Sequence, residues 1–183
     1  MLVRNNSTIL LQPNKSEPTE MKKTLLHFFG FFLFFQNFVQ AQIFTVAAGT
    51  TMNIKSGTIF SAGKLVLTPS ADFTFSDISL TKNSIVSHAA SNPYIARVYN
   101  FSGNTTPFKG SVRIDYNDGT ELNGLDENLL QLNIHDGTSW NAYTATANDT
   151  NNNFVLTTTL TNTILNELTG YVKRHGRCTG NTI

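Results

Sequence analysis

The 183-residue chain contains one cysteine, Cys178, so no disulfide can form within it. Charged residues make up only 14% of the chain, and the formal net charge at pH 7 is +1. A near-neutral chain without a basic stripe argues against a nucleic-acid partner. Because no disulfide can form within the chain, its stability must come from packing. Because its charge is near neutral, nucleic-acid binding is not considered further as a function.

The chain also lacks an apolar run of the roughly 20 residues that a membrane-spanning helix needs. Its longest apolar run, of about 15 residues, follows a basic start at residues 21–23 and ends at Val39-Gln40-Ala41. A basic start, an apolar centre and small residues at the end are typical of a signal peptide. We predict a signal peptide over residues 21–41, cleaved between Ala41 and Gln42, that exports the chain to the cell surface or the extracellular medium.

Residues 1–20 are polar, without pattern, and precede the predicted signal peptide. Because a signal peptide should begin a protein, we infer that translation starts at Met21 and that Met1 was assigned as the start in error. The alternative is a signal peptide with an unusually long N-terminal region before its apolar run. The chain after Ala41 has 142 residues, with nine Lys and Arg against ten Asp and Glu. That length is sufficient to bury a hydrophobic core without cross-links.

Short β-prone runs, separated by turns rich in Gly, Asn and Asp, fill the rest of the chain, and no helical period is sustained. The clearest alternation is in residues 108–116, where Phe108, Val112 and Ile114 share one face. The pattern predicts strands within 43–67 and 73–80, and at 83–88, 94–101, 108–116, 130–134, 140–143, 154–160 and 164–168. We expect an all-β fold over residues 42–170, an antiparallel β-sandwich of immunoglobulin-like or jelly-roll-like type; a β-solenoid coil in residues 43–67 is the less favoured alternative.

The only tryptophan, Trp140, follows a predicted hairpin turn at residues 135–137. A two-residue loop would place Trp140 on the polar face beside Asn133. A three-residue loop that ends in Gly137 would place it opposite Leu132, inside the core. We predict the three-residue loop because burial of the indole is worth on the order of 2–3 kcal/mol.

After Gly170 the composition changes to a basic tail, residues 171–183, that does not continue the strand pattern. Its cations could form a binding patch, but a frameshifted or truncated end is the favoured interpretation, and no function is assigned to it. These cations are Lys173, Arg174, His175 and Arg177.

An acidic stretch between residues 115 and 127 is the strongest candidate for a metal site, because clustered carboxylate and amide oxygens suit calcium. The candidate ligands are Asp115, Asp118, Glu121, Asp126 and Glu127, with Asn117 and Asn123 among them. An EF-hand loop that started at Asp115 would need glycine at its sixth position, which is Thr120. We favour a turn whose side chains bind their own backbone and expect no cofactor, with calcium as the alternative.

Catalytic chemistry has weak support. His135-Asp136 could act as an acid–base pair, but no Ser or Cys motif accompanies it, and a turn already explains Asp136-Gly137. We interpret His88 as a lone structural residue, and no two of His88, His135 and His175 have the spacing of metal ligands. Glycines near Gly57 lack the lysine and helix of a phosphate loop. We therefore expect no catalytic residues and no enzyme activity.

Several short segments resemble a module found in large secreted and surface proteins of gliding-type bacteria, which typically use the type IX secretion system. The segments are Arg97-Val-Tyr-Asn-Phe101, Phe108-Lys-Gly110, Ile114-Asp-Tyr116, Glu121-Leu-Asn-Gly-Leu125, Asn133-Ile-His-Asp-Gly-Thr-Ser-Trp140 and Leu165-Asn-Glu-Leu168. The resemblance covers most of residues 43–169 and implies an extracellular β-sandwich with no catalytic residues. The chain departs from that family at its end, where such proteins continue into further domains and a sorting domain.

Two functions follow as hypotheses. The first is an exported, non-enzymatic module of a cell-surface or adhesion-type protein with a structural or interaction role, whose partner is a surface protein or a glycan. The second is a carbohydrate-binding accessory module of a secreted hydrolase, in which Trp140, Tyr143, Tyr116 or Tyr99 would stack on sugar rings. The predicted burial of Trp140 favours the first. Contact with the membrane is expected only through the signal peptide before cleavage.

Overall fold

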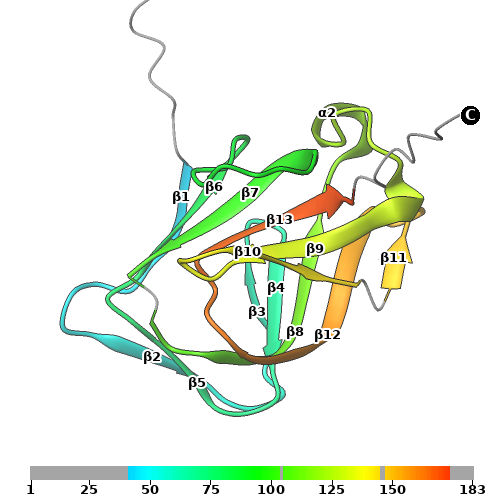
Figure 1. The fold of residues 1–183 in the computed structure, drawn as a ribbon. Helices are drawn as coiled ribbons and strands as arrows, with labels where there is room; N and C mark the ends of the chain where they lie inside the picture. Colours follow the sequence, from blue (N-terminus) through cyan, green and yellow to red (C-terminus); the bar gives the residue numbers. More distant parts are fainter. Residues whose placement is uncertain (1–40, 104, 145–146, 174–183) are drawn as a thin grey trace, which may run out of the picture. The chain divides into compact units, whose positions relative to one another are not determined.

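The computed structural model describes residues 41–103, 105–144 and 147–173 (Figure 1). The predicted signal peptide up to residue 40, residues 1–20 and the tail from residue 174 lie outside the described residues. The first six strands are β1 (Ala41–Thr45), β2 (Thr51–Ile54), β3 (Phe60–Ala62), β4 (Leu65–Pro69), β5 (Phe73–Ser76) and β6 (Ser79–Asn83). Then follow β7 (Tyr94–Ser102), β8 (Phe108–Asp115), the helical turns α2 (Asp118–Glu121) and η1 (Glu127–Leu129), β9 (Leu130–His135), β10 (Trp140–Tyr143), β11 (Ala147–Asp149), β12 (Phe154–Thr163) and β13 (Glu167–Val172).

The strands form two large antiparallel sheets and one small one. The six-stranded sheet has the order β1-β6-β7-β13-β9-β10, and the five-stranded sheet has the order β11-β12-β8-β4-β3. Strands β2 and β5 pair with each other as a separate ribbon. Because the chain passes repeatedly from one sheet to the other, neighbours in a sheet such as β7 and β13 are far apart in sequence.

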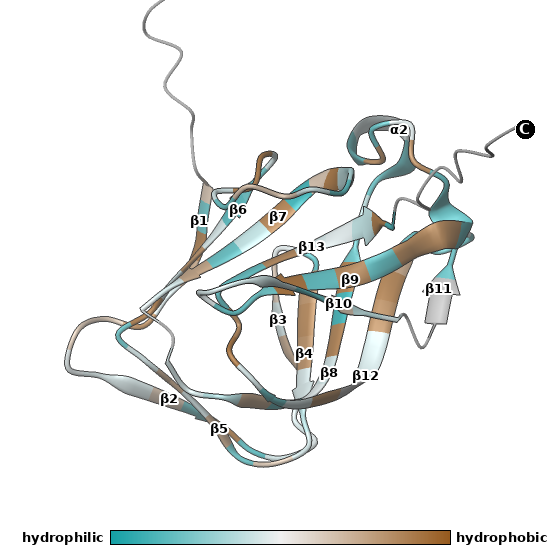
Figure 2. Cartoon of the chain, viewed as in Figure 1, coloured by the Kyte–Doolittle hydropathy of each residue, from teal (hydrophilic) through white to brown (hydrophobic). Residues whose placement is uncertain are grey.

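One hydrophobic core lies between the two large sheets. The alternation predicted for residues 108–116 is present in β8, where Phe108, Val112 and Ile114 are fully buried. Leu132 and Ile134 of β9 enter the same core from the opposite sheet. Figure 2 shows the corresponding alternation of apolar and polar residues along β9. The all-β, antiparallel sandwich expected from the sequence is confirmed.

The strand predictions hold for most elements, but those for residues 83–88 and 164–168 are wrong. Residues 84–88 form bends instead of a strand. Strand β13 starts at Glu167 and runs to Val172, two residues beyond the expected end of the domain at Gly170. Tyr171, which we assigned to the tail, is only 1% exposed. The aromatic side chain and its neighbour Val172 therefore belong to the sheet.

The predicted three-residue hairpin and the core position of Trp140 are wrong. Trp140 pairs with His135 and Asn141 pairs with Ile134, so the loop contains residues 136–139. The cause is Asp136, whose carboxylate accepts hydrogen bonds from the backbone N–H of Thr138 and Ser139 and so builds a longer turn. Trp140 therefore shares the face of His135 and points away from the core, where it is half-buried.

Candidate functional site

A row of directly opposed residues crosses the outer face of the six-stranded sheet. Its members, from β1 to β10, are Gln42, Thr81, Asn100, Glu167, His135 and Trp140. Their sequence neighbours Leu80, Phe101, Leu168 and Ile134 lie in the core, so the row faces away from it. The four inner positions are all held by polar or ionisable side chains. The register thus brings polar residues from five consecutive strands and Trp140 of the sixth into one line.

The loop of residues 84–93, here called the strap, connects β6 to β7 and is fastened to this row by Glu167. One carboxylate oxygen of Glu167 accepts the backbone N–H of Ser87 at 2.5 Å. The other accepts the backbone N–H of His88 at 3.1 Å and contacts His88 Nδ1 at 2.7 Å. Asn100 adds a hydrogen bond from Nδ2 to Ser87 Oγ at 2.8 Å. Glu167 is fully buried, and these donors provide hydrogen-bond partners for both of its carboxylate oxygens.

His88 is not the lone residue that its sequence position suggests. Its imidazole stacks on that of His135, with 3.8 Å between ring centroids and 13° between ring planes. The Trp140 ring meets His135 edge-on, with centroids 5.3 Å apart. The His88 side chain is 41% exposed, whereas His135 is 5% exposed. Three aromatic side chains from the strap, β9 and β10 therefore form one cluster above the sheet.

The histidine pair is not arranged to chelate a metal ion. The lone pair of an imidazole nitrogen lies in the ring plane, so two parallel stacked rings direct their lone pairs side by side instead of toward one point. In addition, His135 Nδ1 accepts the backbone N–H of Gly137 at 3.1 Å. Among residues 41–103, 105–144 and 147–173, no group of three or more His, Cys, Asp or Glu side chains is placed to hold a metal. His175 lies outside the described residues.

Three of the five calcium candidates have partners outside the group. Asp115 binds Arg113 Nε at 2.5 Å, Asp126 caps the η1 turn through the backbone N–H of Asn128, and Glu121 binds Arg97. Asp118 and Glu127 are the two that interact: burial and the neighbouring Asp118 carboxyl raise the pKa of Glu127. The amides are also engaged, since Asn117 caps α2 and Asn123 Nδ2 donates to the Tyr94 carbonyl. The predicted binding of side chains to their own backbone is therefore present at Asn117 and Asp126, whereas Asp115 and Asn123 bind residues outside the stretch.

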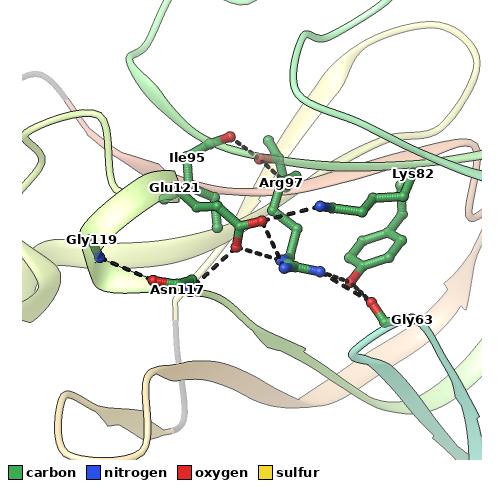
Figure 3. A network of polar contacts seen from close by, with 9 residues as sticks. Gly63, Lys82, Ile95, Arg97, Asn117, Gly119 and Glu121 are labelled. Atoms are coloured by element: carbon green, nitrogen blue, oxygen red, sulfur yellow. Dashed lines mark hydrogen bonds and ion pairs between the residues drawn. The ribbon is translucent and has the colours of Figure 1, made fainter. Parts of the chain in front are cut away.

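Glu121 belongs to a buried ion pair that closes one end of the sandwich (Figure 3). Its two carboxylate oxygens accept hydrogen bonds from Arg97 Nε and Nη2, each at 2.7 Å. Lys82 Nζ lies 3.2 Å from Oε1, and the backbone N–H of Asn117 donates to Oε2 at 2.9 Å. Arg97 is 6% exposed and Glu121 7% exposed. The pair links β7 of the six-stranded sheet to the α2 turn that follows β8 of the five-stranded sheet.

The same arginine reaches the turn between β3 and β4. Arg97 Nη1 donates to the Gly63 carbonyl and to the Tyr99 hydroxyl, both at 3.1 Å, and the Tyr99 hydroxyl also donates to the Gly63 carbonyl at 2.5 Å. Burial raises the pKa of Tyr99 to about 12, although the Arg97 charge acts in the opposite direction. Burial alone would raise the pKa of Glu121, but hydrogen bonds from Arg97 and Lys82 outweigh it, and the pKa is lowered.

Asp136 acts as a turn residue, as predicted. Its carboxylate accepts hydrogen bonds from the backbone of Thr138 and Ser139 and from Asn141 Nδ2. These bonds, those from Ser139 and Thr138 above all, lower the pKa of Asp136 and keep it ionised. It faces the turn, and His135 faces His88, so the two adjacent residues do not form an acid–base pair.

Sequence reasoning missed both buried ionic contacts, although one left a signal. Arg97 occupies a core-facing position between Ile95 and Tyr99, and a charge at such a position requires a buried partner. The contacts of His88 with Glu167 and His135 have no signal in the sequence, because 79 residues separate His88 from Glu167.

Comparison with models of known protein families and with curated protein sequences finds no match to this chain. No helix in the described part of the chain is long and apolar enough to cross a membrane. The fold and the two buried ionic clusters therefore carry the functional interpretation.

Proposed function

We propose that the chain is an exported, non-enzymatic β-sandwich module of a bacterial cell-surface or adhesion-type protein, with a structural or interaction role. The observation that carries the proposal is the use of its buried charges. Glu121 and Glu167 are both almost inaccessible to water, and each ties a connecting segment to the six-stranded sheet. In a domain without a disulfide, these buried charges hold two connecting segments against the sheet.

Cleavage at the predicted bond is compatible with the six-stranded sheet. Ala41 and Gln42 of β1 pair with Lys82 and Thr81. Removal of a leader up to Ala41 would leave the pairs of Phe44 with Leu80 and of Thr45 with Ser79 intact. The resemblance to type IX secretion clients adds a route for that export, and the partner would be a surface protein or a glycan.

Export is tested by tagging the full chain in a gliding-type bacterium and treating intact cells with protease. We expect the product to be accessible outside the cell and its N-terminus to be Gln42. Ala41→Arg should block cleavage, because a signal peptidase needs a small residue there, whereas Gln42→Ser is the matched control and should be cleaved. An intact leader on a protein protected inside the cell would contradict the proposal.

A carbohydrate-binding accessory module is the second candidate, and the position of Trp140 favours it. The ring lies on the outer face of the sheet instead of in the core, which removes the main objection to a stacking role. On an array of polysaccharide fragments, this candidate predicts binding that Trp140→Ala abolishes and Trp140→Phe retains in part. Absence of any glycan signal from the folded protein would reject it.

A further inference from the structure

The strap is held by a set of contacts that depends on protonation. Its two anchoring amides, from Ser87 and His88, donate to the buried Glu167 carboxylate at 2.5 and 3.1 Å. His88 Nδ1 lies 2.7 Å from the same carboxylate and its ring covers His135. Three nitrogen atoms of the strap therefore lie within hydrogen-bond distance of one buried carboxylate.

His135, by contrast, must be neutral in this arrangement. Its Nδ1 accepts the Gly137 N–H, and a ring nitrogen can accept only when it carries no proton. If Nδ1 of His135 carried a proton, its N–H would point at the N–H of Gly137, and the two donors would repel each other. It would also place a positive charge in a ring whose centroid lies 3.8 Å from that of the His88 imidazole. Both contacts oppose protonation of His135 while the strap is closed.

We propose that the stacked His88–His135 pair is an acid-sensitive latch, which holds the strap of residues 84–93 against the outer face of the six-stranded sheet and releases it when His135 takes up a proton. The proposal goes beyond the proposed function and does not depend on it. The 41% exposure of the His88 side chain places solvent next to the stack and gives protons access.

The charges around His135 set the direction of the response. Burial and His88 lower the pKa of His135 from its ordinary value of 6.5, while Glu167 on β13 and Asp136 in the adjacent turn act to raise it. Since the lowered pKa belongs to the closed state, the open state binds the proton more tightly. The latch is therefore closed above pH 6.5 and loosens as the pH falls below that value.

The test is hydrogen exchange of the Ser87 and His88 amides in the full chain between pH 7.5 and pH 5, corrected for intrinsic exchange, together with NMR titration of the imidazoles. We expect protection of both amides to fall by up to about tenfold per pH unit over the range in which His135 titrates. The Tyr116 amide, bound to the Asn153 carbonyl, should keep its protection and reports on global unfolding.

His135→Phe keeps an aromatic ring over His88 but cannot titrate, so its strap amides should stay protected down to pH 5. Loss of protection at the same pH as in the wild type would overturn the proposal. So would titration of His135 with both strap amides still protected, or simultaneous loss of the Tyr116 amide. If the variant does not fold, the wild-type imidazole titration decides the question by itself.

Discussion

Arg97 and Glu121 bind each other through two parallel hydrogen bonds of 2.7 Å, although one lies in the middle of a strand and the other in a four-residue helical turn. A bidentate geometry of this kind is the strongest form of a carboxylate–guanidinium contact. Here it joins β7 to the turn after β8, and the Gly63 carbonyl extends it to the β3–β4 turn. One buried ion pair thus connects three segments at this end of the core.

Removing one partner of this pair should be costly. Glu121→Ala leaves the Arg97 guanidinium buried without its carboxylate, and we expect a loss of about 3–5 kcal/mol of unfolding free energy. Urea denaturation followed by circular dichroism measures it. The control is Lys55→Ala at the ion pair with Asp72, whose side chains are 74% and 50% exposed, and which should leave the midpoint almost unchanged. Equal effects of the two variants would contradict the structural role of Glu121.

The same carboxylate predicts a pH dependence. Burial opposes ionisation of Glu121, but Arg97 and Lys82 outweigh it and hold its folded-state pKa below the ordinary 4.5. Its stabilising contribution is therefore complete above pH 4.5 and is lost as the pH falls through the folded-state pKa. In urea titrations at pH 3–7, the stability gap between wild type and Glu121→Gln should narrow below pH 4.5. A gap that stays constant down to pH 3 would show that Glu121 is not the titrating group.

At Gly110 the backbone of β8 lies close to that of β4, where Gly110 pairs with Pro69. Its φ is +146°, and a Cβ atom added there would lie 2.2 Å from the Thr68 carbonyl oxygen and 2.7 Å from Pro69 Cα. Because both atoms are backbone, they cannot move aside, and Gly110→Ala should cost about 3 kcal/mol or more. The matched control is Gly119→Ala, where the nearest atom is Asn117 Oδ1 at 3.7 Å. Thermal denaturation should separate the two variants clearly, and similar melting temperatures would contradict the predicted clash.

The position of Trp140 can be tested by truncation. Phe108 is completely buried in the core, so Phe108→Ala should cost about 3–5 kcal/mol. Trp140 lies half-buried on the outer face against His135, and Trp140→Ala should cost about 1–2 kcal/mol. Chemical denaturation of both variants provides the comparison. If Trp140→Ala lowered the unfolding free energy more than Phe108→Ala does, the assignment of Trp140 to the outer face would be contradicted.

The sequence predicted the class of fold because strand alternation is a local property. Residues 108–116 alternate between apolar and polar, and a pleated strand places such apolar residues together on one face, where they can be buried. The same reasoning failed at Trp140, since two registers were open and the choice between them rested on hydrophobicity. The Asp136 carboxylate, which binds two backbone amides, decided the register instead.

By itself the sequence determined an antiparallel β-sandwich, most of its strands and the turn role of Asp136, all of which depend on neighbours within a few residues. Only the tertiary structure decided that Arg97 meets Glu121, that Glu167 fastens the strap, and that His88 stacks on His135. For the Arg97–Glu121 pair the physical reason is the packing of the α2 turn against β7. For Glu167 and His135 it is the strand order, which places β13 between β7 and β9. It brings distant side chains into one row across the sheet, and periodicity along the chain does not encode that order.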